Sequence, residues 1–305
     1  NRRGSLPRRG RRRLPVVSLR DPPGDRSLDD RLAFGVVNLD KPPGPSAHQV
    51  AGWVRDMAGV DRAAHAGTLD PKVTGCLPTM LGDATRLAPV FLEGRKEYIA
   101  VLELHGAPPA DLPDVLAAFE GEIYQKPPRK SAVSRRLRTR RIHTLDHLET
   151  RDRQVLLRIE CASGTYVRKL CHDLGLALGT GAHMGDLRRS ATDPFDDRDL
   201  TTLHDLADAL AFAEDGDEEP LREVVAPAER ILTELPAVTI APSAAEQVAT
   251  GAPVYAPGVL DVDDAPQDAL VACFTPDGSA VCLGRLVGDP GAESGVVVDL
   301  ERVLV

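Results

Sequence analysis

The segment QVLLRIECASGTYVRKLCHDLG spans residues 154–175 and passes from strand composition to helical spacing within a few positions. Residues 154–162 are rich in Val, Leu and Ile, which is typical of a strand, and a tight SGTY turn ends it. The apolar side chains that follow recur at the spacing of one helical face: Val167, Leu170, Cys171 and Leu174. The segment therefore predicts a strand that leads directly into an amphipathic helix.

Strand and helix signals alternate on both sides of this segment. FGVVNLDKPPG, residues 34–44, is typical of a strand that ends at its prolines. EYIAVLEL, residues 97–104, is a second strand whose alternation places four residues on one side: Tyr98, Ala100, Leu102 and Leu104. The elements do not follow the regular βαβ rhythm of a doubly wound sheet, so we expect an α+β fold with a mixed sheet.

A helix is predicted directly after the first strand. Ser46 and Gln49 have the spacing of a capping box at its start. The apolar residues that follow occupy positions i, i+3, i+4 and i+7 of a helix and are expected to form its core-facing side: Val50, Trp53, Val54 and Met57.

The amino-acid composition changes twice along the sequence, which divides the chain into three parts. Residues 1–30 are rich in Arg, Pro and Gly and predict a basic, disordered arm. Residues 31–235 form the main domain, whose acidic stretch 196–223 is expected to make surface helices and a loop. Residues 236–305 predict a small β-rich domain, with a hairpin around TPDG at 275–278 and a short helix capped by Ser243 and Glu246.

Charge is distributed unevenly along the chain. The formal net charge is −9, but residues 122–142 carry eight basic side chains against Glu122 alone. Residues 193–234 and 236–305 carry net charges of −11 and −8, and only 6 of the 37 basic residues are lysines. An acidic, lysine-poor surface favours the hypothesis of a protein adapted to a salt-rich cytoplasm.

The sequence gives no sign of a membrane protein or a disulfide framework. No apolar run approaches the ~18 residues that a spanning helix needs, and the first residues lack a secretory signal, so we expect a cytoplasmic location. The five cysteines contain no CxxC pair, which favours reduced, buried thiols over a zinc site.

HAGTLDPKVTG, residues 65–75, has the composition of a loop that presents a carboxylate. Its glycines allow close backbone approach to a ligand, and Pro71 stiffens the chain directly after Asp70. Asp70 is therefore a candidate catalytic carboxylate. The alternative is an ordinary Asp-Pro turn.

Arg168 lies in the first turn of the helix predicted after residue 166, where a cation slightly disfavours the helix dipole. Its guanidinium could pair with a distant carboxylate such as Asp70 and keep it ionised inside a dry pocket. The alternative is a surface arginine without a partner.

The segment 124–143 is too dense in positive charge to be core. In so acidic a chain it favours a surface that contacts phosphates, and the alternative is a solvated charged face. Its basic residues are Lys126, Arg129, Lys130, Arg135, Arg136, Arg138, Arg140 and Arg141.

Several of these segments together resemble the TruB/dyskerin family of pseudouridine synthases. The family's blocks occur in order over most of residues 34–195, and they are LDKPPGPSAHQV, HAGTLDPKVTG, KEYIAVLELH, YQKPPRKSAVSRRLRTRRIH, SGTYVRKLCHDLG and AHMGDLRRSATDPF. The sequences of two blocks, GTLDPKVTG and YQKPPRKSAVSRRLRTRRIH, are similar to those of the archaeal and eukaryotic branch of the family. The archaeal member of that branch is the catalytic protein of H/ACA guide-RNA particles. SAAEQVATGAPVYAPGV resembles the PUA domain that follows in that branch.

This resemblance implies roles for individual residues. Asp70 matches the catalytic aspartate, Arg168 the arginine that pairs with it, and Tyr98 the tyrosine against the target base. His65 matches the histidine beside the flipped nucleotide. Lys41 matches a structural or substrate-side lysine, and Leu187 an apolar residue of the pocket. The sequence departs from the family at Asp193, where a glycine is usual, and in a PUA domain without lysine.

The resemblance also implies substrates and partners. We expect isomerisation of uridine in the T loop of tRNA, in rRNA under a guide RNA, or in both, with small H/ACA RNP proteins as partners. The reaction needs no cofactor and no metal, and neither a Rossmann nor a P-loop signature is found in the sequence. The alternative is a non-catalytic RNA-binding scaffold of an RNP. A zinc deaminase is excluded, because HxE followed by PCxxC does not occur.

Overall fold

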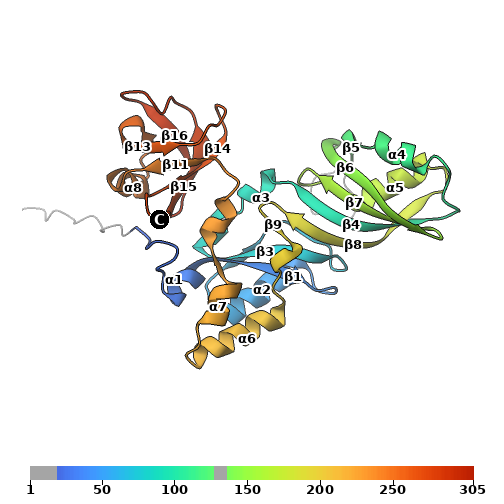
Figure 1. The fold of residues 1–305 in the computed structure, drawn as a ribbon, viewed down its shortest axis with the longest axis horizontal. Helices are drawn as coiled ribbons and strands as arrows, with labels where there is room; N and C mark the ends of the chain where they lie inside the picture. Colours follow the sequence, from blue (N-terminus) through green and yellow to red (C-terminus); the bar gives the residue numbers. More distant parts are fainter. Residues whose placement is uncertain (1–18, 127–135) are drawn as a thin grey trace, which may run out of the picture. The chain divides into compact units, whose positions relative to one another are not determined.

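The computed structural model describes residues 19–126 and 136–305 (Figure 1). Their contacts divide the chain into two compact units. The larger unit comprises residues 23–235, and the smaller one comprises residues 236–305 together with the described segment that ends at Pro22.

A mixed sheet organises the larger unit. Its strands run in the order β10-β1-β3-β8-β4-β7-β6-β5, with β2 added to β3 and β9 added to β8. β3 and β8 pair in parallel and the other neighbours pair antiparallel, as expected for an α+β fold. The strands are β1 (Phe34–Lys41), β2 (Ala63–His65), β3 (Thr74–Gly82), β4 (Lys96–Leu104), β5 (Gly121–Gln125), β6 (Arg138–Arg151), β7 (Gln154–Cys161), β8 (Ala182–Thr192), β9 (Phe195–Asp196) and β10 (Ala226–Pro227).

Short helices connect these strands. They are α1 (Leu28–Ala33), α2 (Ala47–Ala58), η1 (Asp83–Leu87), α3 (Val90–Glu93), α4 (Leu112–Ala118), α5 (Val167–Ala177), η2 (Asp197–Asp199), α6 (Leu203–Glu214), α7 (Glu219–Val224) and η3 (Ala228–Leu232). The predicted capping box of Ser46 and Gln49 begins α2. The acidic stretch forms α6 and α7, as predicted, and Thr202 caps α6 together with Asp205.

The buried face of α2 differs from the predicted one. Trp53 and Met57 are 47 % and 37 % exposed, so the prediction that both belong to the core was wrong. The buried residues are Ala47, Val50, Ala51, Val54 and Ala58. Three alanines share this stripe, and their small side chains let the helix pack closely on the sheet, which the indole of Trp53 would prevent.

The core of the larger unit lies between the sheet and its helices. Along β4 the residues predicted to face one side are all buried, from Tyr98 to Leu104. The predicted strand and helix of residues 154–175 form β7 and α5. The same cluster contains the apolar face of α5, namely Val167, Leu170, Cys171 and Leu174.

The unusual Asp193 takes part in a well-bonded turn. Its carboxylate accepts a hydrogen bond of 3.1 Å from the backbone N–H of Arg95, and its own N–H donates to the Arg95 carbonyl over 3.1 Å. The carboxylate therefore supplies a bond that a glycine at this position could not make, whereas the backbone bond does not depend on the side chain.

The smaller unit contains a sheet in the order β12-β16-β15-β14-β11-β13. Its elements are β11 (Ala237–Ile240), α8 (Pro242–Ala249), β12 (Val254–Tyr255), η4 (Ala256–Gly258), β13 (Val259–Val262), β14 (Leu270–Phe274), β15 (Ala280–Leu286) and β16 (Val296–Val303). The predicted hairpin joins β14 to β15. The predicted cap by Ser243 and Glu246 was wrong, because α8 begins one residue earlier, at Pro242, without a side-chain cap.

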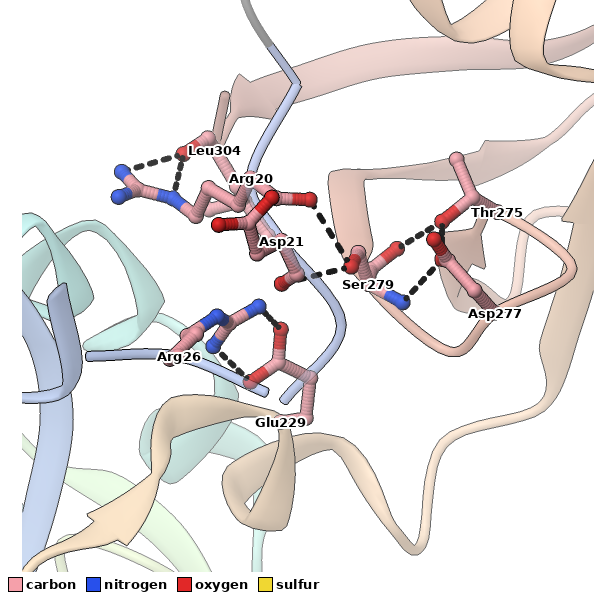
Figure 2. A network of polar contacts seen from close by, with 8 residues as sticks. All are labelled: Arg20, Asp21, Arg26, Glu229, Thr275, Asp277, Ser279 and Leu304. Atoms are coloured by element: carbon pink, nitrogen blue, oxygen red, sulfur yellow. Dashed lines mark hydrogen bonds and ion pairs between the residues drawn. The ribbon is translucent and has the colours of Figure 1, made fainter. Parts of the chain in front are cut away.

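Described residues before α1 are bonded within each unit (Figure 2). In the smaller unit, Ser279 Oγ donates to the carbonyls of Arg20 and Asp21 over 3.2 and 3.1 Å, and Arg20 donates to the Leu304 carbonyl. In the larger unit, Arg26 is 2 % exposed and binds Glu229 through two hydrogen bonds. The predicted disordered arm, residues 1–30, thus ended too late in the chain. Its residues 1–18 lie outside the described part.

All five cysteines are buried. In the described part of the chain, no helix is long and apolar enough to cross a membrane.

Candidate active site

The loop that carries Asp70 joins β2 to β3 and is anchored in the core. Leu69 and Val73 are each 3 % exposed, whereas Asp70 between them is exposed. The N–H of Val73 donates to the Asp70 carbonyl over 2.9 Å and closes a turn around the Asp-Pro pair. Gly67 and Gly75 have φ angles of 92° and 101°, which a glycine adopts without steric cost. The loop therefore presents a carboxylate to solvent from a fixed base.

The Asp70 carboxylate contacts the guanidinium of Arg168, which is the second residue of α5. The two residues are 98 positions apart in the sequence, and the fold brings them together as the resemblance implies. Their side chains are 49 % and 50 % exposed. The dry pocket that we predicted around the pair is therefore not formed by the described residues of the free chain.

A buried glutamine fixes the start of α5. Gln125, at the end of β5, is 2 % exposed. Its side-chain amide accepts from the N–H of Tyr166 over 2.9 Å and donates to the Tyr166 carbonyl over 3.2 Å. Tyr166 is the N-cap residue of α5, so these bonds hold the first turn that carries Arg168. Gln125 was not among the predicted site residues, because nothing in its local pattern distinguishes it from a surface glutamine.

Lys41 holds the other side of the Asp70 loop. It is fully buried at the end of β1, and its Nζ donates to the carbonyls of Pro71 and Val73 over 3.0 and 2.8 Å. A third bond of 2.9 Å reaches the Pro42 carbonyl. Burial lowers the pKa of Lys41. Of the two roles that were open for Lys41, these contacts favour the structural one.

Tyr98 and Leu187 lie on the neighbouring strands β4 and β8. They are 8 % and 7 % exposed and belong to the core cluster that also contains Leu69 and Val73. The apolar residues that flank Asp70 thus share one cluster with the candidate aromatic and aliphatic residues of the pocket.

A buried arginine, Arg189, lies on β8 next to Tyr98 of β4. It is 1 % exposed, and its Nε donates to the Cys76 carbonyl over 2.8 Å. It pairs in register with Tyr98 on β4 and with Gly75 on β3. Arg189 was not among the predicted site residues, although strand alternation places it on the same side of β8 as the buried Leu187.

Electrostatic effects follow from this burial. Burial lowers the pKa of His65, and the nearby Arg189 guanidinium lowers it further, which favours the neutral imidazole. Burial raises the pKa of Tyr98, an effect that Arg189 opposes. His65, the last residue of β2, is half-buried and lies at the start of the Asp70 loop.

The basic residues of segment 124–143 follow β5 and β6, which pair antiparallel at the edge of the sheet. Lys126, Arg136 and Arg141 are exposed, and Arg138 and Arg140 are half-buried. Within the described ranges, none of these five cations forms an ion pair with a carboxylate. Arg129, Lys130 and Arg135 lie outside the described residues.

Arg140 connects this basic edge with α5. A Cβ placed on Gly164, in the SGTY turn before α5, would lie 3.1 Å from the Arg140 guanidinium, and Gly164 has a φ of 76°.

The described side chains contain no group of three or more His, Cys, Asp or Glu that could hold a metal ion.

Family models match four consecutive parts of the chain. A DKCLD (NUC011) domain matches residues 20–51, and the N-terminal domain of TruB family pseudouridylate synthases matches residues 55–111. The C-terminal domain of tRNA pseudouridylate synthase B matches residues 168–233, and a PUA domain matches residues 236–304.

Individual relatives resemble the chain over almost its whole length. A probable tRNA pseudouridine synthase B of Halobacterium salinarum is 68 % identical over 95 % of this chain and 100 % of the relative. The corresponding protein of Methanopyrus kandleri is 46 % identical over 93 % of this chain and 86 % of its own length. Relatives from Halobacterium and Haloarcula, at 68 % and 66 % identity, fit the expectation of a halophile that the acidic, lysine-poor composition suggested.

Solved structures agree with these matches. A chain of a Cbf5-Nop10-Gar1 complex superposes with a TM-score of 0.89 at 43 % identity, covering 94 % of this chain and 90 % of that one. A chain of an H/ACA RNP bound to a substrate RNA containing 2′-deoxyuridine gives 0.87 at 40 % identity, covering 96 % and 91 %. The chain therefore belongs to the TruB family of pseudouridine synthases, with an N-terminal DKCLD domain and a C-terminal PUA domain.

Proposed function

We propose that Asp70 is the catalytic carboxylate with which this enzyme isomerises uridine to pseudouridine, and that Arg168 orients it. The observation that carries this proposal is the contact between the Asp70 carboxylate and the Arg168 guanidinium. The pair lies between a loop held by Lys41 and a helix held by Gln125. A non-catalytic scaffold would have no need for a carboxylate held in this way.

The reaction needs little from the protein beyond a placed carboxylate. The bond from ribose to uracil N1 breaks, the base turns, and a new bond forms through C5, so no atom is gained or lost overall. A carboxylate can serve as nucleophile or as base at the sugar. Both roles require access from solvent, and the half-exposed Asp70 side chain offers it.

Tyr98 limits how the target base can be held. Removing a uridine from its stack costs a few kcal/mol. Stacking on an aromatic ring returns about 1–3 kcal/mol per base. Because only 8 % of Tyr98 is exposed, a base can rest on a small part of its surface, and we expect a return near the lower end. Leu187 would line the pocket, and His65 would contact the flipped nucleotide as a neutral imidazole.

We infer two RNA contexts for this activity. The relatives named tRNA pseudouridine synthase B support a uridine in the T loop of tRNA. The structures of Cbf5 with Nop10 and Gar1, and of an H/ACA RNP with substrate RNA, support guide-directed modification of rRNA. Small H/ACA RNP proteins would then be partners of this chain, which would act in the cytoplasm.

The basic edge of the sheet is proposed to contact RNA phosphates. Five described cations without carboxylate partners lie there in a chain of net charge −9, so their charge is available to an anionic ligand. We propose residues 31–235 as the catalytic domain and residues 236–305 as a PUA domain that binds RNA. The latter carries a net charge of −8, so its contacts would depend on hydrogen bonds and shape more than on charge.

Turnover by two variants tests the assignment. Asp70→Asn and Asp70→Ala should abolish pseudouridine formation while RNA binding is retained, because neither change touches the basic edge. The substrates are a T-loop RNA alone, and an rRNA fragment with guide RNA and partner proteins. Product from either variant would refute the role of Asp70, and the two substrates separate stand-alone from guide-directed action.

A further inference from the structure

Arg189, on β8, is a buried cation. It is 1 % exposed, and no ion pair with a carboxylate is found for it within residues 19–126 and 136–305. The neighbouring Arg188 shows the usual alternative, a two-bond pair with Asp40 near the surface. A buried, unpaired charge is costly, and an apolar residue of similar volume would fit a sheet interior at less cost. An arginine is therefore expected here only if its hydrogen bonds offset that cost.

The hydrogen bonds of Arg189 reach both ends of the Asp70 loop. NH2 lies 3.4 and 3.3 Å from the carbonyls of Ala66 and Gly67, which precede Asp70. Nε donates to the carbonyl of Cys76, which follows the loop in β3, over 2.8 Å. One planar group thus joins the start of the loop, directly after β2, to strand β3.

Lys41 completes this arrangement from the middle of the loop. It donates to the carbonyls of Pro71 and Val73, between the points that Arg189 holds. Two buried cations therefore bind the backbone of residues 66–76 at five carbonyls. The loop itself makes few ladder bonds, so its shape depends on these donors.

The backbone of Arg189 is closely packed against the neighbouring strands. A Cβ on Gly75 would lie 2.2 Å from the Arg189 carbonyl oxygen, so the backbones of β3 and β8 lie too close at this point for a side chain on residue 75. Tyr98 is its register partner on the other side. Arg189 thus contacts the Asp70 loop through its side chain and pairs with Tyr98 along the sheet, so we expect a change at Arg189 to affect both.

We propose that Arg189 is a positioning residue that sets the Asp70 loop and Tyr98 in register with Arg168, without touching the RNA itself. The proposal rests on the proposed role of Asp70. A guanidinium suits this task because its rigid, planar set of five N–H donors reaches several carbonyls at once. A lysine carries the same charge but is a compact point donor and cannot span both ends of the loop.

Arg189→Lys and Arg189→Met test the proposal, with Arg95→Lys as the matched control. Arg95 is an arginine at the start of β4 whose ion pairs lie at the surface, with a side chain 59 % exposed. For each variant we would measure the thermal midpoint, the RNA dissociation constant and the single-turnover rate, the last at a temperature where every protein is fully folded. Arg189→Lys should lower the single-turnover rate about 100-fold, the effect of a catalytic group displaced by about 1 Å. Its RNA affinity should equal that of the wild type.

The outcomes separate the possible failures. A wild-type rate in folded Arg189→Lys or Arg189→Met would overturn the positioning role, and so would a rate loss matched by lost RNA affinity. If Arg189→Met does not fold, Arg189→Lys still decides the question, because it keeps the charge. Asp70→Asn measured in parallel shows whether the proposed function holds: activity there would refute the function itself, whereas an inactive Asp70→Asn beside a fully active Arg189→Lys would refute only the positioning.

Discussion

Two arginine–carboxylate pairs in the larger unit differ in burial, and we predict opposite consequences when each arginine is replaced by alanine. Arg26 and Glu229 have side chains 1 % and 11 % exposed and are joined by hydrogen bonds of 2.8 and 2.6 Å (Figure 2). Arg168 and Asp70 are half exposed. Removing one partner of a buried pair leaves an uncompensated charge and costs about 3–5 kcal/mol. An exposed pair contributes about 0.2–1 kcal/mol.

These magnitudes convert to thermal midpoints and rates. In a unit of this size, 1 kcal/mol shifts the midpoint by about 2–4 °C. Arg26→Ala should therefore lower it by about 6–20 °C, and Arg168→Ala by less than about 4 °C. Arg168→Ala frees the Asp70 carboxylate to turn away, for which we expect a rate loss of about 100-fold, or about 2.7 kcal/mol of activation free energy. Folded Arg26→Ala should keep the wild-type rate.

The assay is single-turnover conversion of a T-loop RNA tritiated at uracil C5, which loses its label when C5 takes the bond to ribose. Circular dichroism at the same salt concentration gives the midpoints, and Arg168→Lys serves as a control that keeps the charge. A wild-type rate in Arg168→Ala would refute the reasoning. A midpoint drop in Arg168→Ala as large as that in Arg26→Ala would refute it equally, because the pair would then be structural.

Three further perturbations follow from charge and burial. Raising the salt concentration from 0.1 to 2 M should raise the thermal midpoint. The screening length falls from about 10 Å at 0.1 M to about 3 Å at 1 M, so repulsion between the acidic surface groups is largely screened. An equal or higher midpoint at 0.1 M would contradict the hypothesis that the protein is adapted to high salt. Folding lowers the pKa of His65, so as the pH falls through about 6.5 the unfolded chain takes up a proton before the folded chain does. The wild type should therefore lose stability relative to His65→Gln between pH 7 and 5. Parallel curves of unfolding free energy against pH for the two proteins would reject this prediction. Arg138→Ala and Arg141→Ala should each weaken RNA binding and reduce the slope of log Kd against log salt by about 0.7–0.9, which Arg55→Ala, as a surface control, should leave unchanged.

Local patterns predicted the elements on which the site depends. The alternation along β4, the turn before α5 and the hairpin of β14 and β15 each follow from side chains within one short segment. The contact of Asp70 with Arg168 joins residues 98 positions apart, and local sequence alone left Asp70 with the alternative of an Asp-Pro turn and Arg168 with that of a surface arginine. The order of the sequence blocks and their resemblance to a family supplied that link.

The errors came from residues whose burial depends on distant neighbours. Trp53 fits the apolar period of α2 as well as Val54 does, and only the closeness of the sheet decides that alanines face it. Gln125 and Arg189 are polar, and polar residues are assigned to the surface unless their partners are known. Their partners are backbone carbonyls and amides of other segments, which leave no trace in the side-chain sequence.

The site thus combines a backbone that is fixed by buried hydrogen-bond donors with an ion pair that is half exposed to solvent. Lys41, Gln125 and Arg189 are buried and bind backbone groups around the site, so they fix the positions of Asp70 and Arg168. The pair itself remains half exposed, which keeps it accessible to a ribose and costs little in stability. Covering the pair would strengthen its electrostatics, since charges interact more strongly once water is removed. We therefore expect the RNA, when it binds, to supply the cover that the described part of the chain lacks. Catalytic strength would then depend on the substrate being fully seated, and an RNA that binds without covering the pair would be converted slowly even though its affinity is high.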